Sequence, residues 1–176
     1  MDKLLAVTAI GADRTGLVRD LTRCITAAGG NIRESRMTTL GSEFAVMMLV
    51  EGNWHAINKV KETLDTLGED DSLTINVRAT EEQASSDAGA PYNVDVIALD
   101  QEGIVAGLSG FFSARELIIA DVNTRRYNAP HTGAPMFSIQ MTVNLPRSMH
   151  IATLREEFHE YCESQNLDAV IEPAQR

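Results

Sequence analysis

The chain has 176 residues, which is enough for one ordinary domain or for two small ones with thin cores. Its 15 Lys and Arg against 25 Asp and Glu give a formal net charge of −10, which opposes a broad contact with the anionic phosphate backbone of nucleic acid. Two cysteines without a CxxC motif argue against a disulfide framework, and no apolar run is long enough for a membrane span. We therefore expect a cytoplasmic protein that neither binds nucleic acid directly nor enters a membrane.

The first 79 residues predict six elements in the order β-α-β-β-α-β. Short apolar or alternating runs predict the strands, and apolar residues at spacings of three and four predict the helices. Gly29 and Gly30 end the first helix, because glycine accepts the positive φ that a helix C-terminus often needs. In chain order we expect a strand at 4–10, a helix at 17–28, a strand from 32, a strand at 44–50, a helix at 57–67 and a strand at 73–77.

The second half of the chain repeats this pattern. The apolar positions recur at an offset of 87 residues at first, and at 93 and then 94 later, with the added residues in segment 127–134. The polar stretch TEEQASSDAGAP is typical of a linker. We predict a first domain at 1–79, a linker at 80–91 and a second domain at 92–176. The fold class is α+β, two tandem ferredoxin-like repeats with antiparallel sheets and helices on one face.

The two repeats differ in one strand. In the second repeat, Ser138, Gln140 and Thr142 alternate with apolar residues, as expected where one face of a sheet meets water. The first repeat has FAVMMLV there, with Met47 and Leu49 at the alternate positions. We expect that strand to be covered on both faces, either by the other domain or by a second copy of the chain, and less readily by a dedicated partner.

The segment GADRTGLV at 11–18 is the first candidate binding site. A turn after a strand presents backbone N–H groups at a helix N-terminus, where the helix dipole favours a carboxylate. Asp13 can accept a hydrogen bond from an ammonium group, and Asn31 offers a donor and an acceptor. The structural alternative is that Asp13 caps the helix, Gly16 permits close packing and Asn31 closes a turn. Spacing alone favours that alternative.

The turn GADRTGLV, the helix after it and the strand entry GGNI at 29–32 resemble the ACT domain. The two-domain chain resembles the glycine cleavage system transcriptional repressor family, most closely over residues 11–54. In ACT domains that bind amino acids, the turn after the first strand and the Asn entering the second strand line a site at an interface between domains. Carried over by position, Gly11, Asp13 and Asn31 stand at that site, with Arg14 and Gly16 shaping the turn.

The same resemblance implies a regulator and not an enzyme. It implies a chain that senses glycine or a similar small amino acid, forms a homo-oligomer and represses transcription indirectly, by binding a DNA-bound transcriptional activator of the glycine cleavage genes. Glycine would relieve that repression. The alternative is an ACT-type binding module that controls a metabolic enzyme. The second repeat departs from the pattern, because Gln101 replaces the arginine of the turn and Ile118 stands in place of Asn31, so an equivalent second site is doubtful.

The other chemical groups point to no catalytic, metal or cofactor site. None of the four histidines has a metal-ligand spacing such as HExxH, and no nucleophile elbow, P-loop or dinucleotide-binding turn occurs. Cys24 lies on an apolar helical stripe, where a buried inert thiol is commoner than a nucleophile. Arg125 and Arg126 begin the long hairpin RRYNAPHTGAP, whose charges either grip an acidic partner or keep a strand edge soluble.

Overall fold

The computed structural model describes residues 2–68, 73–82 and 89–174. Its internal contacts divide the chain into two compact units, residues 1–83 (unit 1) and 84–176 (unit 2), and each is described by itself. The linker predicted at 80–91 includes residues 83–88, which lie outside the described residues, so its extent stays a prediction. No helix in the described part of the chain is long and apolar enough to cross a membrane.

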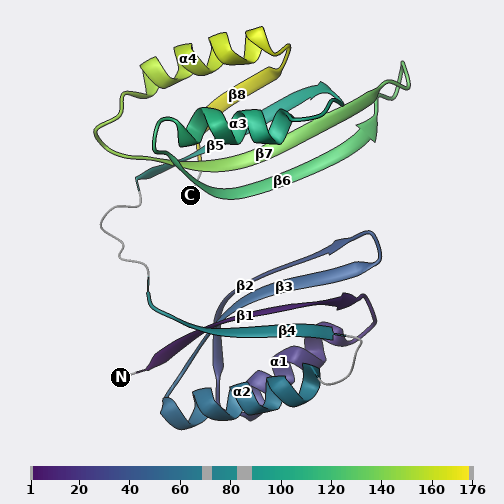
Figure 1. Ribbon diagram of the computed structural model, residues 1–176, viewed down its shortest axis with the longest axis vertical. Coiled ribbons are helices and arrows are strands. Elements are labelled where there is room, and N and C mark those ends of the chain that lie inside the picture. Colours follow the sequence, from purple (N-terminus) through teal and green to yellow (C-terminus); the bar gives the residue numbers. More distant parts are fainter. Residues whose placement is uncertain (1, 69–72, 83–88, 175–176) are drawn as a thin grey trace. The chain divides into compact units, whose positions relative to one another are not determined.

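Unit 1 has the order β-α-β-β-α-β (Figure 1). Its elements are β1 (Lys3–Ala12), α1 (Leu17–Ala27), β2 (Asn31–Leu40), β3 (Glu43–Gly52), α2 (Trp54–Gly68) and β4 (Leu73–Thr80). The strands form one antiparallel sheet in the order β2-β3-β1-β4, and both helices cover the same face of it. Leu21 and Ile25 of α1 lie four residues apart and pack with Val60 and Leu64 of α2 in one buried core, as the helical spacing predicts.

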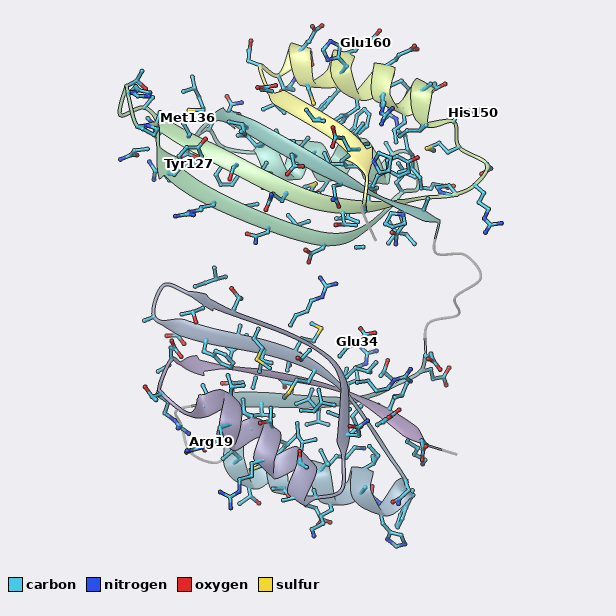
Figure 2. The ribbon with its side chains drawn as sticks, turned by 180° about the vertical axis from the view of Figure 1, so that it is seen from behind. Arg19, Glu34, Tyr127, Met136, His150 and Glu160 are labelled. Atoms are coloured by element: carbon cyan, nitrogen blue, oxygen red, sulfur yellow. The ribbon has the colours of Figure 1, made fainter. Side chains whose placement is uncertain are left out.

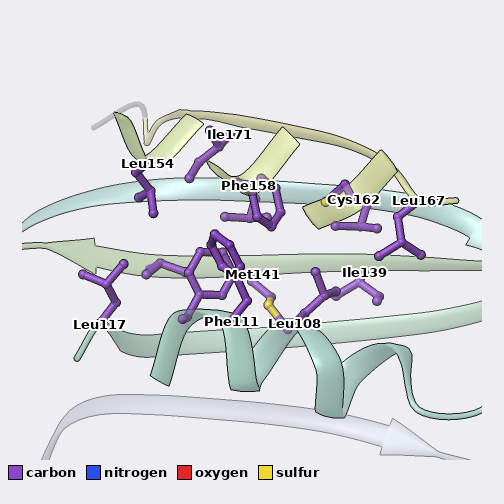
Figure 3. Close-up of a cluster of buried hydrophobic side chains, with 14 of the residues drawn as sticks. Leu108, Phe111, Leu117, Ile139, Met141, Leu154, Phe158, Cys162, Leu167 and Ile171 are labelled. Atoms are coloured by element: carbon purple, nitrogen blue, oxygen red, sulfur yellow. The ribbon is translucent and has the colours of Figure 1, made fainter. Parts of the chain in front are cut away.

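Unit 2 repeats this architecture. Its elements are β5 (Ala90–Leu99), α3 (Ile104–Ser113), β6 (Ile118–Asn128), β7 (Pro135–Leu145), α4 (Ile151–Ser164) and β8 (Asp168–Pro173). The sheet has the order β6-β7-β5-β8. Aromatic rings fill the space between the helices, where Phe111 of α3 lies 5.3 Å from Phe158 of α4, centroid to centroid (Figure 3). The predicted fold class, two ferredoxin-like repeats with the helices on one face of each sheet, is confirmed.

Strand register aligns the two units residue by residue. Gly11 pairs with Phe44 in unit 1, and Ala98 pairs with Phe137 in unit 2. Both second strands have an irregularity after their second residue, between Ile32 and Glu34 in β2 and between Ile119 and Asp121 in β6. The structural equivalence therefore follows the offsets of 87 and 93 that the sequence predicts.

The sheet face opposite the helices, which we call the open face, differs between the units. In unit 2 the central strand β7 presents Ser138, Gln140 and Thr142 on the open face, where Gln140 Nε2 donates to Asp95 Oδ1 at 3.1 Å, although Ile97 of β5 is 44% exposed on the same face. In unit 1 the open face carries apolar side chains from the two central strands, including Ile10, which is 53% exposed, and Met47, which is 58% exposed. No described element of unit 1 covers Met47, so the expectation that another surface covers this strand stays a prediction.

If a second copy of the chain covers the open face of unit 1, Met47→Glu should weaken self-association. The substitution puts a charge into a surface that would have to become dry, while the exposed position should let unit 1 fold normally. Sedimentation of the variant should show a smaller species than the parent at the same concentration. Thr66→Glu, at an exposed position on α2, is the matched control and should leave the mass unchanged. Equal masses for all three proteins would contradict self-association through this face.

Candidate functional site

The turn after β1 joins the end of a central strand to the start of α1. The backbone N–H of Asp13 donates to the Ser42 carbonyl at 3.1 Å, which fixes the turn against the β2–β3 hairpin. Gly16 occupies the N-cap position of α1 with φ of +88°, a conformation that favours glycine, and no side chain caps the helix there. Asp13 therefore does not act as a helix cap, which removes one structural explanation for it.

Arg14 and Arg19 hold the carboxylate of Asp20 in the first turn of α1. Arg14 Nη1 donates to Asp20 Oδ2 at 2.9 Å, and Arg19 Nη2 lies 3.1 Å from Asp20 Oδ1. The hydrogen bond from Arg14, followed by that from Arg19, lowers the pKa of Asp20 below its usual value. The guanidinium of Arg14 thus ties the turn to the helix, in keeping with a role in shaping the turn.

The carboxylates of Asp13 and of its equivalent in unit 2, Asp100, have different surroundings. In unit 2, Arg126 of the long hairpin reaches back to Asp100, with Nε 2.8 Å from Oδ2. In unit 1 no described residue pairs with the side chain of the exposed Asp13. The turn of unit 1 therefore presents a free carboxylate beside a helix N-terminus, whereas the corresponding carboxylate of unit 2 is already neutralised.

Asn31 begins β2 on the exposed edge of the sheet. Its Nδ2 donates to Glu51 Oε1 at 2.8 Å, and the other oxygen of Glu51 lies 3.5 Å from Arg33 Nε. The amide oxygen of Asn31 keeps its capacity to accept a hydrogen bond. Ile118 stands at the equivalent place in unit 2, opposite Asn144 on β7, so a polar pair at this point exists only in unit 1 among the described residues.

Glu51 is the residue that sequence reasoning missed at this point. The sequence gives only a weak indication of this role. Glu51 follows the apolar run FAVMMLV two residues after Leu49, so both side chains lie on the same face of the strand. Register opposite Asn31 is what turns that position into a partner, and register depends on the hairpin turn rather than on composition.

Within one copy of unit 1, the turn and Asn31 lie at opposite ends of the sheet. Gly11 pairs with Phe44 and Asn31 with Glu51, so seven residue steps along β3, or roughly 23 Å at the rise of a strand, separate them. The structure brings Gly11, Asp13, Arg14 and Gly16 together, but it does not bring Asn31 to them. One amino acid cannot contact both places in a single unit.

The long hairpin of unit 2 has an ordered tip. The N–H of Ala129 donates to the Ala134 carbonyl at 2.8 Å, and the N–H of Gly133 donates back to the Ala129 carbonyl at 2.8 Å. Tyr127 and Met136 face each other across the strands just before the tip (Figure 2). Since Arg126 binds Asp100, one of the two adjacent arginines serves contacts within the unit. Across residues 2–68, 73–82 and 89–174, no group of His, Cys, Asp and Glu has the arrangement of a metal site.

Comparison with known proteins places these features in a family context. The model of the ACT domain family matches residues 3–78. The glycine cleavage system transcriptional repressors of Escherichia coli (strain K12) and Shigella flexneri are each 32% identical to the chain over 167 residues, which is 95% of this chain and 88% of theirs.

Two solved structures resemble the whole chain. A crystal structure assigned to a glycine cleavage system transcriptional repressor matches with a TM-score of 0.73 and 25% identity, over 100% of this chain and 99% of the other. A protein of unknown function from Galdieria sulphuraria matches with a TM-score of 0.81 and 22% identity, over 99% of this chain and 100% of the other, and that likeness concerns the fold alone. Two successive repeats therefore occur in both of these solved structures.

Proposed function

The chain belongs to the family of the glycine cleavage system transcriptional repressors, built from tandem ACT repeats, and from that premise we propose that it is an amino-acid-responsive repressor that acts through another protein. Unit 1 senses a small amino acid, with glycine the first candidate. The ligand then alters the contact between this chain and a DNA-bound transcriptional activator of the glycine cleavage genes. The proposal includes a cytoplasmic site of action and no catalytic role.

The observation that carries the sensing role is the free carboxylate of Asp13. An amino acid has an ammonium group, which a free carboxylate can bind, and a carboxylate, which the N–H groups at the start of α1 can bind. Asp100 is less suited to that task because Arg126 already occupies it. We therefore assign sensing to unit 1.

Participation of Asn31 in the same site requires two copies of unit 1. The distance between the turn and Asn31 excludes a shared ligand within one copy, so the turn of one chain would meet Asn31 of a second chain. This proposal agrees with the homo-oligomer expected from the sequence. Glu51 would then fix the amide of Asn31 so that its oxygen points to the ligand.

Identification of the partner tests the regulatory role. The untagged chain, immobilised through an antibody, is incubated with extract of its own source organism, and the retained proteins are identified by mass spectrometry. A DNA-binding activator supports the proposal. Retention of a metabolic enzyme and no DNA-binding protein would instead favour a module that controls enzyme activity.

The indirect mechanism predicts that the purified chain alone gives no sequence-specific shift of promoter DNA at physiological salt. The physical reason is the net charge of −10, which opposes approach to the phosphate backbone. Gel-shift titration with a fragment of the glycine cleavage promoter measures this, and a shuffled fragment of equal length is the control. A shift seen with the promoter and not with the shuffled fragment would overturn the indirect mechanism.

A further inference from the structure

A hollow of about 370 Å³ lies between α1 and α2 of unit 1 and belongs to no site described so far. Cys24 and Ala28 at the end of α1 and Thr63 of α2 form its lining of small side chains, and the charged groups at it are Asp20, Arg23 and Lys59. Because the side chains on the facing helix surfaces are small, the helices leave open space that a longer side chain from elsewhere can enter.

Unit 2 fills the same place with its own side chains. By the offsets of 87 and 94, the positions of Cys24, Ala28 and Thr63 correspond to Phe111, Arg115 and Glu157. The guanidinium carbon of Arg115 lies 3.7 Å from the centre of the Phe111 ring, and Arg115 Nη2 lies 2.7 Å from Glu157 Oε2 (Figure 3 for Phe111). A hollow of about 250 Å³ lies beside this pair, and its lining includes Arg115 and Glu157, which already form an ion pair with each other.

The charges at the hollow of unit 1 do not satisfy each other. Asp20 is held by Arg14 and Arg19, while the side chains of Arg23 and Lys59 are exposed and have no partner within the described residues. A locally positive surface in a chain of net charge −10 attracts an acidic group. Unit 2 places a carboxylate in the corresponding region, since Glu157 stands at the position of Thr63 and pairs there with Arg115.

We propose that the hollow between α1 and α2 is the docking site for an acidic segment of the protein partner. A carboxylate of the partner lies between Arg23 and Lys59, and a small apolar side chain beside it covers Cys24 and Ala28. A free metabolite suits the hollow less well, because sites for small molecules enclose most of the ligand and the two cations here stand exposed. This inference rests on the proposed function, whose partner is the DNA-binding activator.

Cys24 provides a direct test in the unmodified chain. Cys24 is half-buried at the hollow. Cys162 is only 2% exposed, and burial raises the pKa of the Cys162 thiol to about 11. Iodoacetamide should therefore modify Cys24 alone in the folded protein. The alkylation rate of Cys24 is measured by mass spectrometry in the free chain and in its complex with the activator recovered by the pull-down. We expect at least a tenfold slower reaction in the complex.

Two variants test the charges. Arg23→Glu combined with Lys59→Glu should raise the Kd for the activator by about tenfold or more, because like charges would then face each other. Thr63→Glu keeps both cations but adds a carboxylate beside them, at the position of Glu157, which pairs with Arg115 in unit 2, and should weaken binding similarly. Arg147→Glu changes an exposed cation of unit 2 that pairs with no described residue, and should alter the Kd by less than about twofold.

The outcomes separate this inference from the proposed function. If the parent binds the activator but Cys24 reacts equally fast in the complex, or the charge variants bind like the parent, the docking site is wrong and the proposed function stands. Protection of Cys24 by 10 mM succinate or phosphate alone would show a small-anion site and also overturn the inference. If the parent binds no activator, both fail. Circular dichroism of each variant confirms folding, and the alkylation result in the parent decides the question where a variant does not fold.

Discussion

Replacement of Asn31 with alanine should weaken binding of the preferred amino acid by about five- to 150-fold, the equivalent of about 1–3 kcal/mol for a lost partner of a buried polar ligand. The side chain is exposed in the isolated unit and its one described hydrogen bond goes to Glu51, so the fold of unit 1 should not depend on it. Calorimetric titration with glycine, serine and alanine measures the change. Asp13→Asn should give a loss of similar direction, because it removes the charge that binds the ammonium group.

The matched controls lie in unit 2. Asp100→Asn removes a carboxylate that Arg126 already occupies and should leave ligand affinity unchanged. Ile118→Ala changes the equivalent of Asn31. Because Ile118 is 57% exposed, this substitution should change neither stability nor ligand affinity much. Tight binding by Asn31→Ala, or no binding of any of the three amino acids by the parent, would contradict the sensing assignment.

Gly30→Leu should destabilise unit 1 strongly. A Cβ at Gly30 would lie 2.9 Å from Val60 Cγ2 and 3.0 Å from both Ile25 Cγ2 and Val50 Cγ1, all of them side chains of the buried core. Overpacking of this kind costs about 1–3 kcal/mol, and the further three carbons of leucine should raise the cost to the upper end. Leu117 occupies the equivalent position of unit 2, so the same residue is suited to one repeat and excluded from the other.

Denaturant unfolding followed by tryptophan fluorescence measures this effect in unit 1, because Trp54 of α2 is the single tryptophan of the chain. The control is Gly110→Leu, an exposed site on α3 where a Cβ would meet nothing within 4 Å. That substitution should leave the Trp54 transition unchanged and stabilise α3 by about 0.5–1 kcal/mol through helix propensity. An unchanged denaturant midpoint of the Trp54 transition in Gly30→Leu would contradict this prediction, because it would mean that the core around Gly30 can expand without loss of stability.

Periodicity was sufficient to predict the elements and the repeat. Leu21 and Ile25, four residues apart, mark a helix face, and the alternation around Ile139 and Met141 marks a strand with one wet face. The separation of Asp13 from Asn31 also follows from topology, because β1 and β2 both run antiparallel to β3 and the end of one lies far from the start of the other. Periodicity could not predict how deeply each apolar side chain is buried. The apolar Ile118 lies on the open face, and nothing in its neighbours predicts that.

Contacts between distant segments were also beyond the sequence. Arg126 reaches Asp100 only because the register of β6 brings the hairpin beside the turn. The adjacent Arg125 is the same residue type, but its side chain lies on the opposite face of the sheet. The hollow between α1 and α2 depends on the volumes of Cys24, Ala28 and Thr63 together, whereas an apolar pattern treats Cys24 and Phe111 alike. Side-chain volume across two helices decides whether a repeat has a site or a filled core.

The affinity of the chain for its activator, measured with and without glycine, tests the account most directly. A ligand acts as a switch only if it binds the free and complexed forms with different affinity. We predict that saturating glycine raises the Kd of the complex by about fivefold or more, the usual range for such coupling, and that Asn31→Ala abolishes the effect at the same glycine concentration. An equal Kd with and without glycine, and likewise with serine and alanine, would contradict an amino-acid-responsive repressor.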